Sequence, residues 1–361
     1  MHDPDTSSRP SGNGARWALI GTAVAVAAGA YAYVGGWLSP QRLTPDRLVD
    51  DFQQAAGDHP GFRRNHAKGV CVTGYFEGNG NATAFSTAPV FGVGRTPVVG
   101  RFAIPGGNPY APDSSVPIRS MALRFNLANG QQWRTGMNSM PVFPVATPKA
   151  FQAQMDANRK DPATGKPDPA KLAAFFAAHP ETAPFRAWAK NARPSASFVT
   201  ERYYGLNAFH FIDADGARHA VRWRMEPEAP DAGAAPAGAD NYLVGGLQRR
   251  LAAGPARWRL LVTLADPGDP TDDATRTWPA NRRTIDAGVL VIEHEQPQDS
   301  GPCRDVNFDP TVLPTGIAIS DDPLLAARSA VYADSHLRRT REEARVPGAA
   351  STADAGMEGA R

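Results

Sequence analysis

The sequence predicts an α+β protein with an antiparallel β core, preceded by one N-terminal transmembrane helix. Three observations support this class. Several segments alternate apolar and polar residues and border tight-turn dipeptides, as half-buried antiparallel strands do. Glycine (34) and proline (33) together approach a fifth of the 361 residues, which favours strands, turns and long loops over a helical bundle. One apolar stretch without charges stands near the N-terminus.

The apolar stretch, residues 17–38, indicates export of the protein. As a helix it would extend ~33 Å, enough to cross the ~30 Å hydrocarbon core of a bilayer. Arginines precede it, so the positive-inside rule places residues 1–16 in the cytoplasm and the following domain on the periplasmic or other extracytoplasmic side. A cleaved signal peptide is the alternative, because residues 30–32 (Ala-Tyr-Ala) have the pattern of a cleavage site. We expect the domain at residues 39–345 and a disordered tail at residues 346–361.

Strands and helices are expected in separate stretches of this domain. Alternation predicts strands at residues 69–76, 121–127, 208–212, 220–225 and 257–264. The dipeptides Asn129-Gly130 and Asp215-Gly216 are hairpin signals. Apolar faces and helix-start signals predict helices at residues 147–158, 169–178 and 323–343, and a shorter one beginning at Thr44 and Pro45. Residues 226–240, rich in proline, alanine and glycine, are expected to form a surface loop.

Charge and cysteine usage narrow the function classes. Lysine plus arginine (38) nearly balances aspartate plus glutamate (36), which argues against a dedicated nucleic-acid binder. A Gly-x-Ser-x-Gly motif is missing from the sequence, which counts against a hydrolase of that type. Two cysteines, Cys71 and Cys303, are too few for a disulfide framework or a zinc cluster. They could form one bridge in an oxidising compartment, and the sequence leaves open whether they meet.

Two segments far apart in the sequence carry the candidate chemistry. In the first, basic residues surround His66 just before a predicted strand. In the second, on the predicted C-terminal helix, Arg328 and Tyr332 are neighbours at spacing i, i+4. A guanidinium beside a phenol favours the phenolate and lowers a pKa that starts near ~10, and a phenolate is a hard oxygen ligand for ferric iron. Taken singly, each segment also fits an ordinary surface histidine or a core tyrosine with an arginine stacked over it.

The order of residues in both segments resembles the haem catalases, and the short chain is most similar to the catalase-related peroxidases. The distal motif of the family, His-Ala-Lys-Gly, four residues and then Gly-Tyr-Phe-Glu, is present without a gap at residues 66–77. The proximal motif, Arg-x-x-x-Tyr-x-Asp-x-His-x-x-Arg, is complete at residues 328–339. Three further family segments have counterparts here, at residues 96–102, 138–143 and 306–316. The resemblance covers residues 43–342 and implies a catalase-like antiparallel β-barrel with surrounding helices.

The resemblance also implies a haem b cofactor with its iron. Tyr332 would ligate the iron as a phenolate stabilised by Arg328, and Asp322 would orient that arginine. His66 would lie with Asn138 over the opposite, distal face. There it would take the proton of a hydroperoxide and return it to the leaving oxygen, so that the O–O bond breaks heterolytically.

Four further residues match positions that hold the cofactor in the family. Arg63, Arg101 and Arg339 would pair with the haem propionates. Phe143, at the end of the segment that begins with Asn138, would be a further contact of the cofactor.

Four positions depart from the family pattern. Ala103 replaces a serine that supports the distal histidine, and Ser139 replaces the second residue of a distal asparagine pair. Asn65 replaces an apolar residue beside the distal histidine, and Asn207 replaces a proximal-side histidine. A catalase must orient a second peroxide in a tight apolar pocket, and these changes count against that step. They leave peroxide cleavage, followed by reduction by an external donor, as the expected reaction.

The expected function is therefore a haem-dependent peroxidase that reduces hydrogen peroxide or organic hydroperoxides with an unidentified one-electron donor. Three alternatives stay open: a true catalase, a hydroperoxide isomerase on the same scaffold, and a non-enzymatic haem-binding or haem-transfer protein. Retention of a distal histidine argues against the last, because a carrier needs no distal base. We expect no nucleic-acid partner, membrane attachment through the N-terminal helix, and a monomer or dimer, because the segments that interlock large catalases into tetramers are largely missing.

Overall fold

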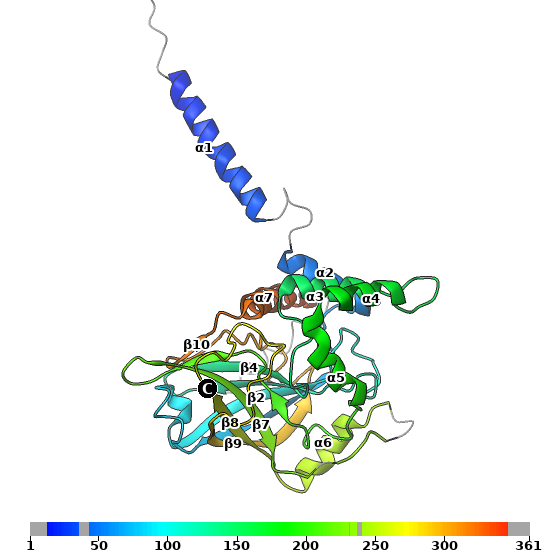
Figure 1. Ribbon diagram of the computed structural model, residues 1–361, viewed down its shortest axis with the longest axis vertical. Coiled ribbons are helices and arrows are strands. Elements are labelled where there is room, and N and C mark those ends of the chain that lie inside the picture. The colour runs from blue at the N-terminus through cyan, green and yellow to red at the C-terminus, as the bar shows by residue number, and fades with distance from the viewer. Residues whose placement is uncertain (1–12, 36–42, 231, 237–239, 346–361) are drawn as a thin grey trace, which may run out of the picture. The chain divides into compact units, whose positions relative to one another are not determined.

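The computed structural model describes residues 13–35, 43–230, 232–236 and 240–345 (Figure 1). They fall into two units, one that ends at Thr44 and one that begins at Pro45. Of the two predicted tails, residues 1–12 and 346–361 lie outside the described residues.

The first unit contains the helix α1 (Asn13–Val34). Within the described part of the chain, this is the helix that is long and apolar enough to cross a membrane. It begins four residues before the predicted segment 17–38 and ends at Val34, and residues 36–38 of that segment lie outside the described residues. Gly35 follows the last helical residue, and glycine has a low helix propensity.

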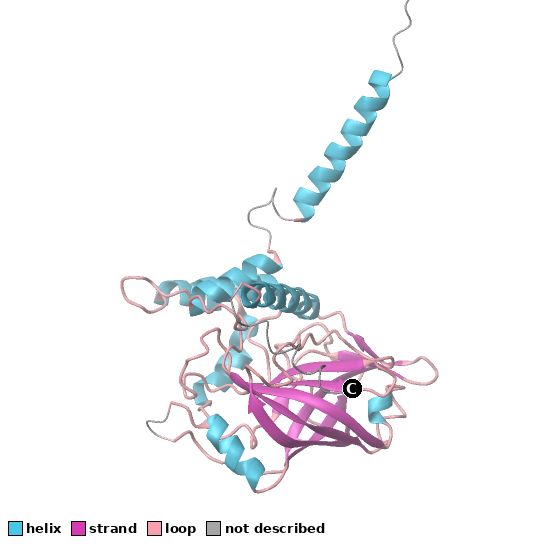
Figure 2. Cartoon of the chain, turned by 180° about the vertical axis from the view of Figure 1, so that it is seen from behind, coloured by secondary structure: helices cyan, strands magenta, loops and turns pink. Residues whose placement is uncertain are grey.

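The second unit is built on a closed antiparallel barrel (Figure 2). Among the described residues, eight strands pair in the order β7-β5-β4-β3-β2-β1-β9-β8, and β8 pairs with β7 to close the ring. The barrel strands are β1 (Gly69–Gly78), β2 (Gly94–Ala103), β3 (Ser120–Asn126), β4 (Gln132–Asn138), β5 (Tyr203–Tyr204), β7 (Arg218–Pro227), β8 (Ala256–Leu264) and β9 (Thr284–Pro297). Two short strands, β6 (Phe209–Ile212) and β10 (Ile317–Ile319), extend the sheet beside β7.

Large apolar side chains at alternate strand positions fill the barrel. On β3, Met121, Leu123 and Phe125 are fully buried, and Phe125 stacks on Trp133 of β4 with ring centres 4.6 Å apart. Because side chains alternate between the two faces of a strand, the residues between them, such as Ala122, belong to the outer wall. Small or polar residues of the outer wall lie side by side on β2, β3 and β4, among them Ala103, Ser120, Ala122, Gly136 and Asn138.

The helices lie outside the barrel, as Figures 1 and 2 show. They are α2 (Pro45–Ala56), α3 (Pro148–Ala157), α4 (Pro169–Ala178), α5 (Ala183–Asn191), α6 (Leu243–Ala252) and α7 (Pro323–Glu343), with 3₁₀ turns η1 (Pro89–Phe91) and η2 (Pro180–Thr182). α7 has the predicted bounds because Asp322 caps it, its carboxylate accepting the amide of Leu324 at 2.9 Å, and Pro323 occupies the first turn. The helices α5 and α6 were not predicted. The loop predicted at residues 226–240 begins later, because β7 continues to Pro227 against β8.

A disulfide joins Cys71, on β1, to Cys303, in the loop between β9 and β10. The Cα atoms are 5.3 Å apart, both residues are fully buried, and 232 positions separate them in the sequence. The bridge that the sequence left open is therefore present. It ties the strand that follows His66 to the chain that leads to α7.

Candidate functional site

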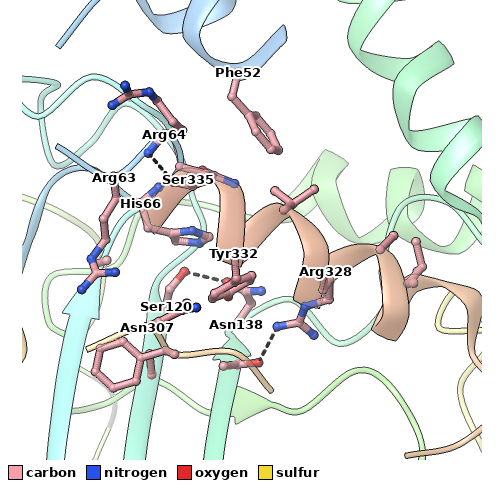
Figure 3. Close-up of a pocket in the computed structure, with 18 of the residues that line it drawn as sticks. Phe52, Arg63, Arg64, His66, Ser120, Asn138, Asn307, Arg328, Tyr332 and Ser335 are labelled. Carbon is pink, nitrogen blue, oxygen red and sulfur yellow. Dashed lines mark hydrogen bonds between the residues drawn. The ribbon is translucent and has the colours of Figure 1, made fainter. Parts of the chain in front are cut away.

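One cavity lies between the outer wall of the barrel and α7, and Figure 3 shows residues that line it. It encloses about 1410 Å³, its open mouth included. All eight candidate residues of the sequence line this cavity: His66, Asn138, Arg63, Arg101, Phe143, Arg328, Arg339 and Tyr332. Residues from both ends of the domain sequence therefore meet at one site.

Strands β2, β3 and β4 form one wall of the cavity. Two rows of paired residues cross them, Ala103–Ser120–Asn138 and Arg101–Ala122–Gly136. Ser120 donates a hydrogen bond of 2.6 Å to Oδ1 of Asn138, which leaves the amide nitrogen of Asn138 as the donor for a ligand. Because Ala103, Ser120, Ala122 and Gly136 have small side chains or none, this wall is flat enough for a large planar molecule to lie against it.

Helix α7 forms the opposite wall. Arg328, Tyr332, His336 and Arg339 follow one another at spacings of four, four and three residues, which puts them on one helix face. All four line the cavity. The i, i+4 spacing in the sequence was sufficient to predict that Arg328 and Tyr332 are neighbours on this face.

Tyr332 and Arg328 lie together beside the backbone of Gly136. The guanidinium carbon of Arg328 is 5.9 Å from the centre of the Tyr332 ring, and Nη2 donates to the Gly136 carbonyl at 3.3 Å. A Cβ atom on Gly136 would lie 3.2 Å from this Nη2 and 3.3 Å from the phenol oxygen of Tyr332. The missing side chain at position 136 therefore makes room for the phenol oxygen.

Arg328 is oriented through Asn207. Nη1 of Arg328 donates to Oδ1 of Asn207 at 2.5 Å, and Nδ2 of Asn207 donates to Oδ2 of Asp322 at 2.7 Å. Asp322 therefore reaches Arg328 through the amide of Asn207, which stands between the two charged groups. Burial raises the pKa of Asp322, whereas hydrogen bonds from Asn207 and the amide of Leu324 oppose that rise.

On the other side of the cavity, His66 has a backbone conformation that is rare for its type. Its φ is 57°, in the left-handed region, which costs a non-glycine residue of order 1–3 kcal/mol. Figure 3 shows its imidazole directed into the cavity. The neighbouring residue Arg64 ties this segment to α7, since its amide donates to Oγ of Ser335 at 3.4 Å and its guanidinium pairs with Glu342.

His66 is held as a neutral base. Burial, followed by the charges of Arg101, Arg328 and Arg63, lowers the pKa of its imidazole to about 3, while the Asn138 side chain acts in the opposite direction. A neutral imidazole has one nitrogen that accepts a proton and one that donates a hydrogen bond. His66 is therefore neutral at physiological pH, with one ring nitrogen unprotonated.

The disulfide-bonded loop holds Arg63. One guanidinium nitrogen, Nη2, donates to the backbone carbonyls of Cys303, Arg304 and Val306 at 2.9 to 3.1 Å. The guanidinium carbon also lies 5.7 Å from the centre of the Phe308 ring. These contacts orient the side chain, and among the described residues its guanidinium forms no ion pair within 4 Å, although the charges of Asp305 and Glu343 act on it.

Arg63, Arg101 and Arg339 form a cluster of like charges at one end of the cavity. Burial and the charge of Arg339 lower the pKa of Arg63 to about 10. Burial and the charges of Arg63 and Arg339 lower the pKa of Arg101. Burial also lowers the pKa of Arg339. Nε of Arg339 is buried without a hydrogen-bond partner among the described residues. The carboxylate of Glu343 lies 3.9 Å from this Nε, and that of Asp305 lies 4.0 Å from Nη2. Such a cluster fits a ligand with two carboxylates, which would offset the repulsion.

The structure also places the departures from the family pattern. Ala103 lines the cavity, and the hydroxyl of Ser120 stands beside it on the next strand. Ser139 does not line the cavity and instead exchanges hydrogen bonds with the backbone of Arg119, so its substitution does not alter the lining. The sequence interpretation missed Ser120 and Gly136, which belong to no motif. Their only signal is the alternation along β3 and β4, which makes them outward-facing.

This arrangement defines a class of protein, a closed β-barrel with a cofactor cavity between its outer wall and a helix that presents a tyrosine. The family model for catalases matches residues 40–347. The chain is 37% identical to a catalase-related peroxidase of Synechococcus elongatus, over 90% of this chain and 97% of that protein. It is 32% identical to a catalase-related peroxidase of Mycolicibacterium paratuberculosis, over 82% of this chain and 95% of that protein.

Among solved structures, catalase A from Saccharomyces cerevisiae has the same fold, with a TM-score of 0.70 at 19% identity. The match covers 79% of this chain and 63% of that one. The chain belongs to the catalase family, whose members generally bind haem. The predicted family and the predicted catalase-like barrel are thereby confirmed.

Proposed function

We propose that this protein is a haem b peroxidase that reduces hydrogen peroxide or organic hydroperoxides with an external one-electron donor. Membership of the catalase family makes it an oxidoreductase acting on peroxide. The two relatives with the identities given above are named catalase-related peroxidases. The observation that carries the finer proposal is the presence of His66, Asn138 and Tyr332 in one cavity that ends in three arginines.

The residues of the cavity fit haem b. Tyr332 would offer its phenol oxygen to the iron, in the space that Gly136 leaves open. The arginine cluster would pair with the two propionates, whose negative charges would offset the repulsion among the three guanidinium groups. Phe143 and the flat wall of β2–β4 would pack against the porphyrin. The bound haem would supply the electron-transfer chemistry.

His66 and Asn138 would handle the protons of the substrate. The neutral imidazole accepts the proton of the hydroperoxide and later delivers it to the departing oxygen, while the Asn138 amide nitrogen donates a hydrogen bond to a peroxide oxygen. In balance, one hydroperoxide, two protons and two electrons give one alcohol, or water from hydrogen peroxide, and one further water. Two molecules of a one-electron donor supply the electrons.

We further propose that the domain works on the extracytoplasmic side of a membrane, with α1 as its anchor. A buried disulfide is typical of exported proteins, because the cytosol keeps thiols reduced. The length and apolarity of α1 fit an anchor and also a signal sequence. Recovery of full-length protein from the membrane fraction of cells supports the anchor, whereas a soluble form that lacks residues 1–38 contradicts it.

The function is tested on the purified full chain loaded with haem. We expect hydrogen peroxide to be consumed in step with oxidation of a phenolic or dye donor, with little oxygen released when the donor is omitted. Tyr332→Phe should change the visible spectrum of the ferric protein, and His66→Gln should slow the reaction with peroxide by about 10²-fold or more. Rapid oxygen release without a donor would instead identify a catalase, and conversion of an organic hydroperoxide without a donor an isomerase.

Two control variants match these substitutions. Tyr75 carries the guanidinium of Arg95 over its ring at 4.3 Å, outside the cavity, so Tyr75→Phe removes a phenol from an equivalent pair. His294, exposed on β9, is the matching control for His66. Both controls should leave the spectrum and the peroxide reaction unchanged. A haem-loaded protein that does not react with peroxide would contradict the proposal and favour a haem-binding or haem-transfer protein.

A further inference from the structure

The left-handed backbone of His66 requires contacts that hold it in place. At φ 57°, the Cβ atom of an L-residue crowds its own carbonyl, so the conformation persists only where the surroundings impose it. A hydrogen-bonding side chain at the position directly before His66 could supply such a contact. In this chain that position is Asn65.

The side chain of Asn65 joins the two chain segments that meet at His66. Its Oδ1 accepts the backbone amide of His66 at 2.9 Å and the backbone amide of Gly106 at 2.8 Å. An amide oxygen has two lone pairs, so both bonds can form at once. Gly106 then returns a bond, because its carbonyl accepts the amide of Ala67 at 2.8 Å.

Gly106 thereby holds His66 on both sides, through the residue before it and the residue after it. Gly106 has a φ of 118°, a conformation that favours glycine. The loop is also tied down next to His66, since Ile104 donates its amide to the Lys68 carbonyl at 3.2 Å. The position of the imidazole is therefore set by a backbone clamp in which Asn65 supplies two of the hydrogen bonds.

We propose that Asn65 is a positioning residue that fixes the left-handed conformation of His66 and so aims the imidazole into the cavity. This role compensates for Ala103, which offers no hydroxyl to orient the histidine from the barrel wall. Asn65 itself handles no proton of the substrate. The effect of Asn65 on catalysis rests on the proposed peroxidase function. The claim that Asn65 fixes the backbone conformation of His66 does not depend on that function.

The conformational claim is tested by hydrogen exchange of backbone amides, which needs no enzymatic activity. In Asn65→Ala, the peptides that contain the amides of His66 and Gly106 should exchange about tenfold faster or more, because both amides lose their acceptor. Asn65→Asp keeps an acceptor oxygen at the same place and should restore the protection. Asn65→Leu, which has similar bulk and no acceptor, should behave like alanine.

Asn108 provides a matched control in the same loop. Its Oδ1 accepts the amide of Tyr110 at 2.8 Å, and its side chain does not line the cavity. Asn108→Ala therefore removes an equivalent bond without touching His66. Unchanged exchange at His66 and Gly106 in Asn65→Ala, or an equal effect of Asn108→Ala there, would overturn the proposal.

The catalytic consequence is measured on the haem-loaded full chain by the rate constant of its reaction with hydrogen peroxide. We expect a decrease of about tenfold or more in Asn65→Ala and Asn65→Leu, with the rate of the later donor step unchanged. A normal peroxide rate in variants whose amides exchange faster would refute the positioning role. If the unmodified protein does not react with peroxide at all, the proposed function fails, and the exchange experiment still decides whether Asn65 holds His66.

Discussion

His66 and Leu206 both have a left-handed backbone, with φ values of 57° and 63°, and both line the same cavity. Among the described residues they are the only non-glycine residues with positive φ. Each is adjacent to an asparagine whose side chain bonds a second segment of the chain, Asn65 before His66 with Gly106 and Asn207 after Leu206 with Arg328. Backbone strain in this domain is therefore concentrated where the candidate chemistry takes place, as expected of a pre-organised site.

Replacement of Asn207 by alanine should loosen the proximal side. Arg328 would lose an acceptor and the buried carboxylate of Asp322 would lose a donor, so we expect the free energy of unfolding to fall by about 1–3 kcal/mol. The visible spectrum of the haem-loaded protein should also change, because Arg328 lies beside Tyr332. Urea unfolding and absorption spectra measure both effects. Asn158→Ala, which removes an exposed asparagine bond to Gln154, serves as control. Identical behaviour of the two variants would contradict this role of Asn207.

Gly136→Ala should displace the phenol of Tyr332. The added Cβ would lie 3.3 Å from the phenol oxygen and 3.2 Å from Arg328, so both must shift by a few tenths of an ångström. Overpacking of this kind costs about 1–3 kcal/mol, and we expect the affinity for haem to fall by about tenfold or more. Haem transfer to an excess of apomyoglobin measures this loss. In Gly246→Ala the nearest atom is 3.9 Å away, so that variant should retain haem normally.

Reduction of the Cys71–Cys303 disulfide should weaken both the fold and the cofactor site. The bridge closes a loop of 232 positions, and loss of such a bridge costs about 2–5 kcal/mol. The freed loop carries the carbonyls that orient Arg63, so haem should dissociate faster. Unfolding and haem-transfer assays with and without dithiothreitol test this. The Cys71→Ser, Cys303→Ser double variant should have the stability and the haem dissociation rate of the reduced protein, with or without dithiothreitol. Equal stability of the reduced and the oxidised protein would count against the prediction.

Acid should destabilise the haem-free protein partly through His66. Burial, then Arg101, lowers the pKa of His66 from 6.5 to about 3. Between these values the unfolded chain binds a proton that the folded chain does not bind, so the free energy of unfolding decreases as the pH falls from 6.5 towards 3. His66→Gln cannot titrate and should lose less stability over this range. Urea unfolding of both proteins at neutral and acidic pH measures how much more stability the unmodified protein loses than His66→Gln. This difference reports His66, because the two proteins share all other titratable groups. Parallel pH dependences would show that His66 is not held neutral by the fold.

Local patterns were enough to predict much of the framework. The helix that carries Arg328 and Tyr332 was predicted with its observed bounds, because its cap, its first-turn proline and its spacing are all local signals. Strands with clear alternation, such as β3 and β8, were also predicted. The short helices α5 and α6 and the two-residue strand β5 were not, because segments of this length acquire their structure from packing against the rest of the domain.

The sequence by itself determined which residues are the candidates for the chemistry, because the motifs around His66 and Tyr332 have fixed spacing within single segments. Only the tertiary structure decided how those residues are held. The relay through Asn207, the hydroxyl of Ser120 beside Asn138 and the space at Gly136 all depend on contacts between separate segments. The same holds for Asn65, which the sequence marked only as a departure from the family pattern. A hydrogen bond between distant segments requires its partners within about 3 Å of each other, and this proximity is set by the packing of the whole barrel.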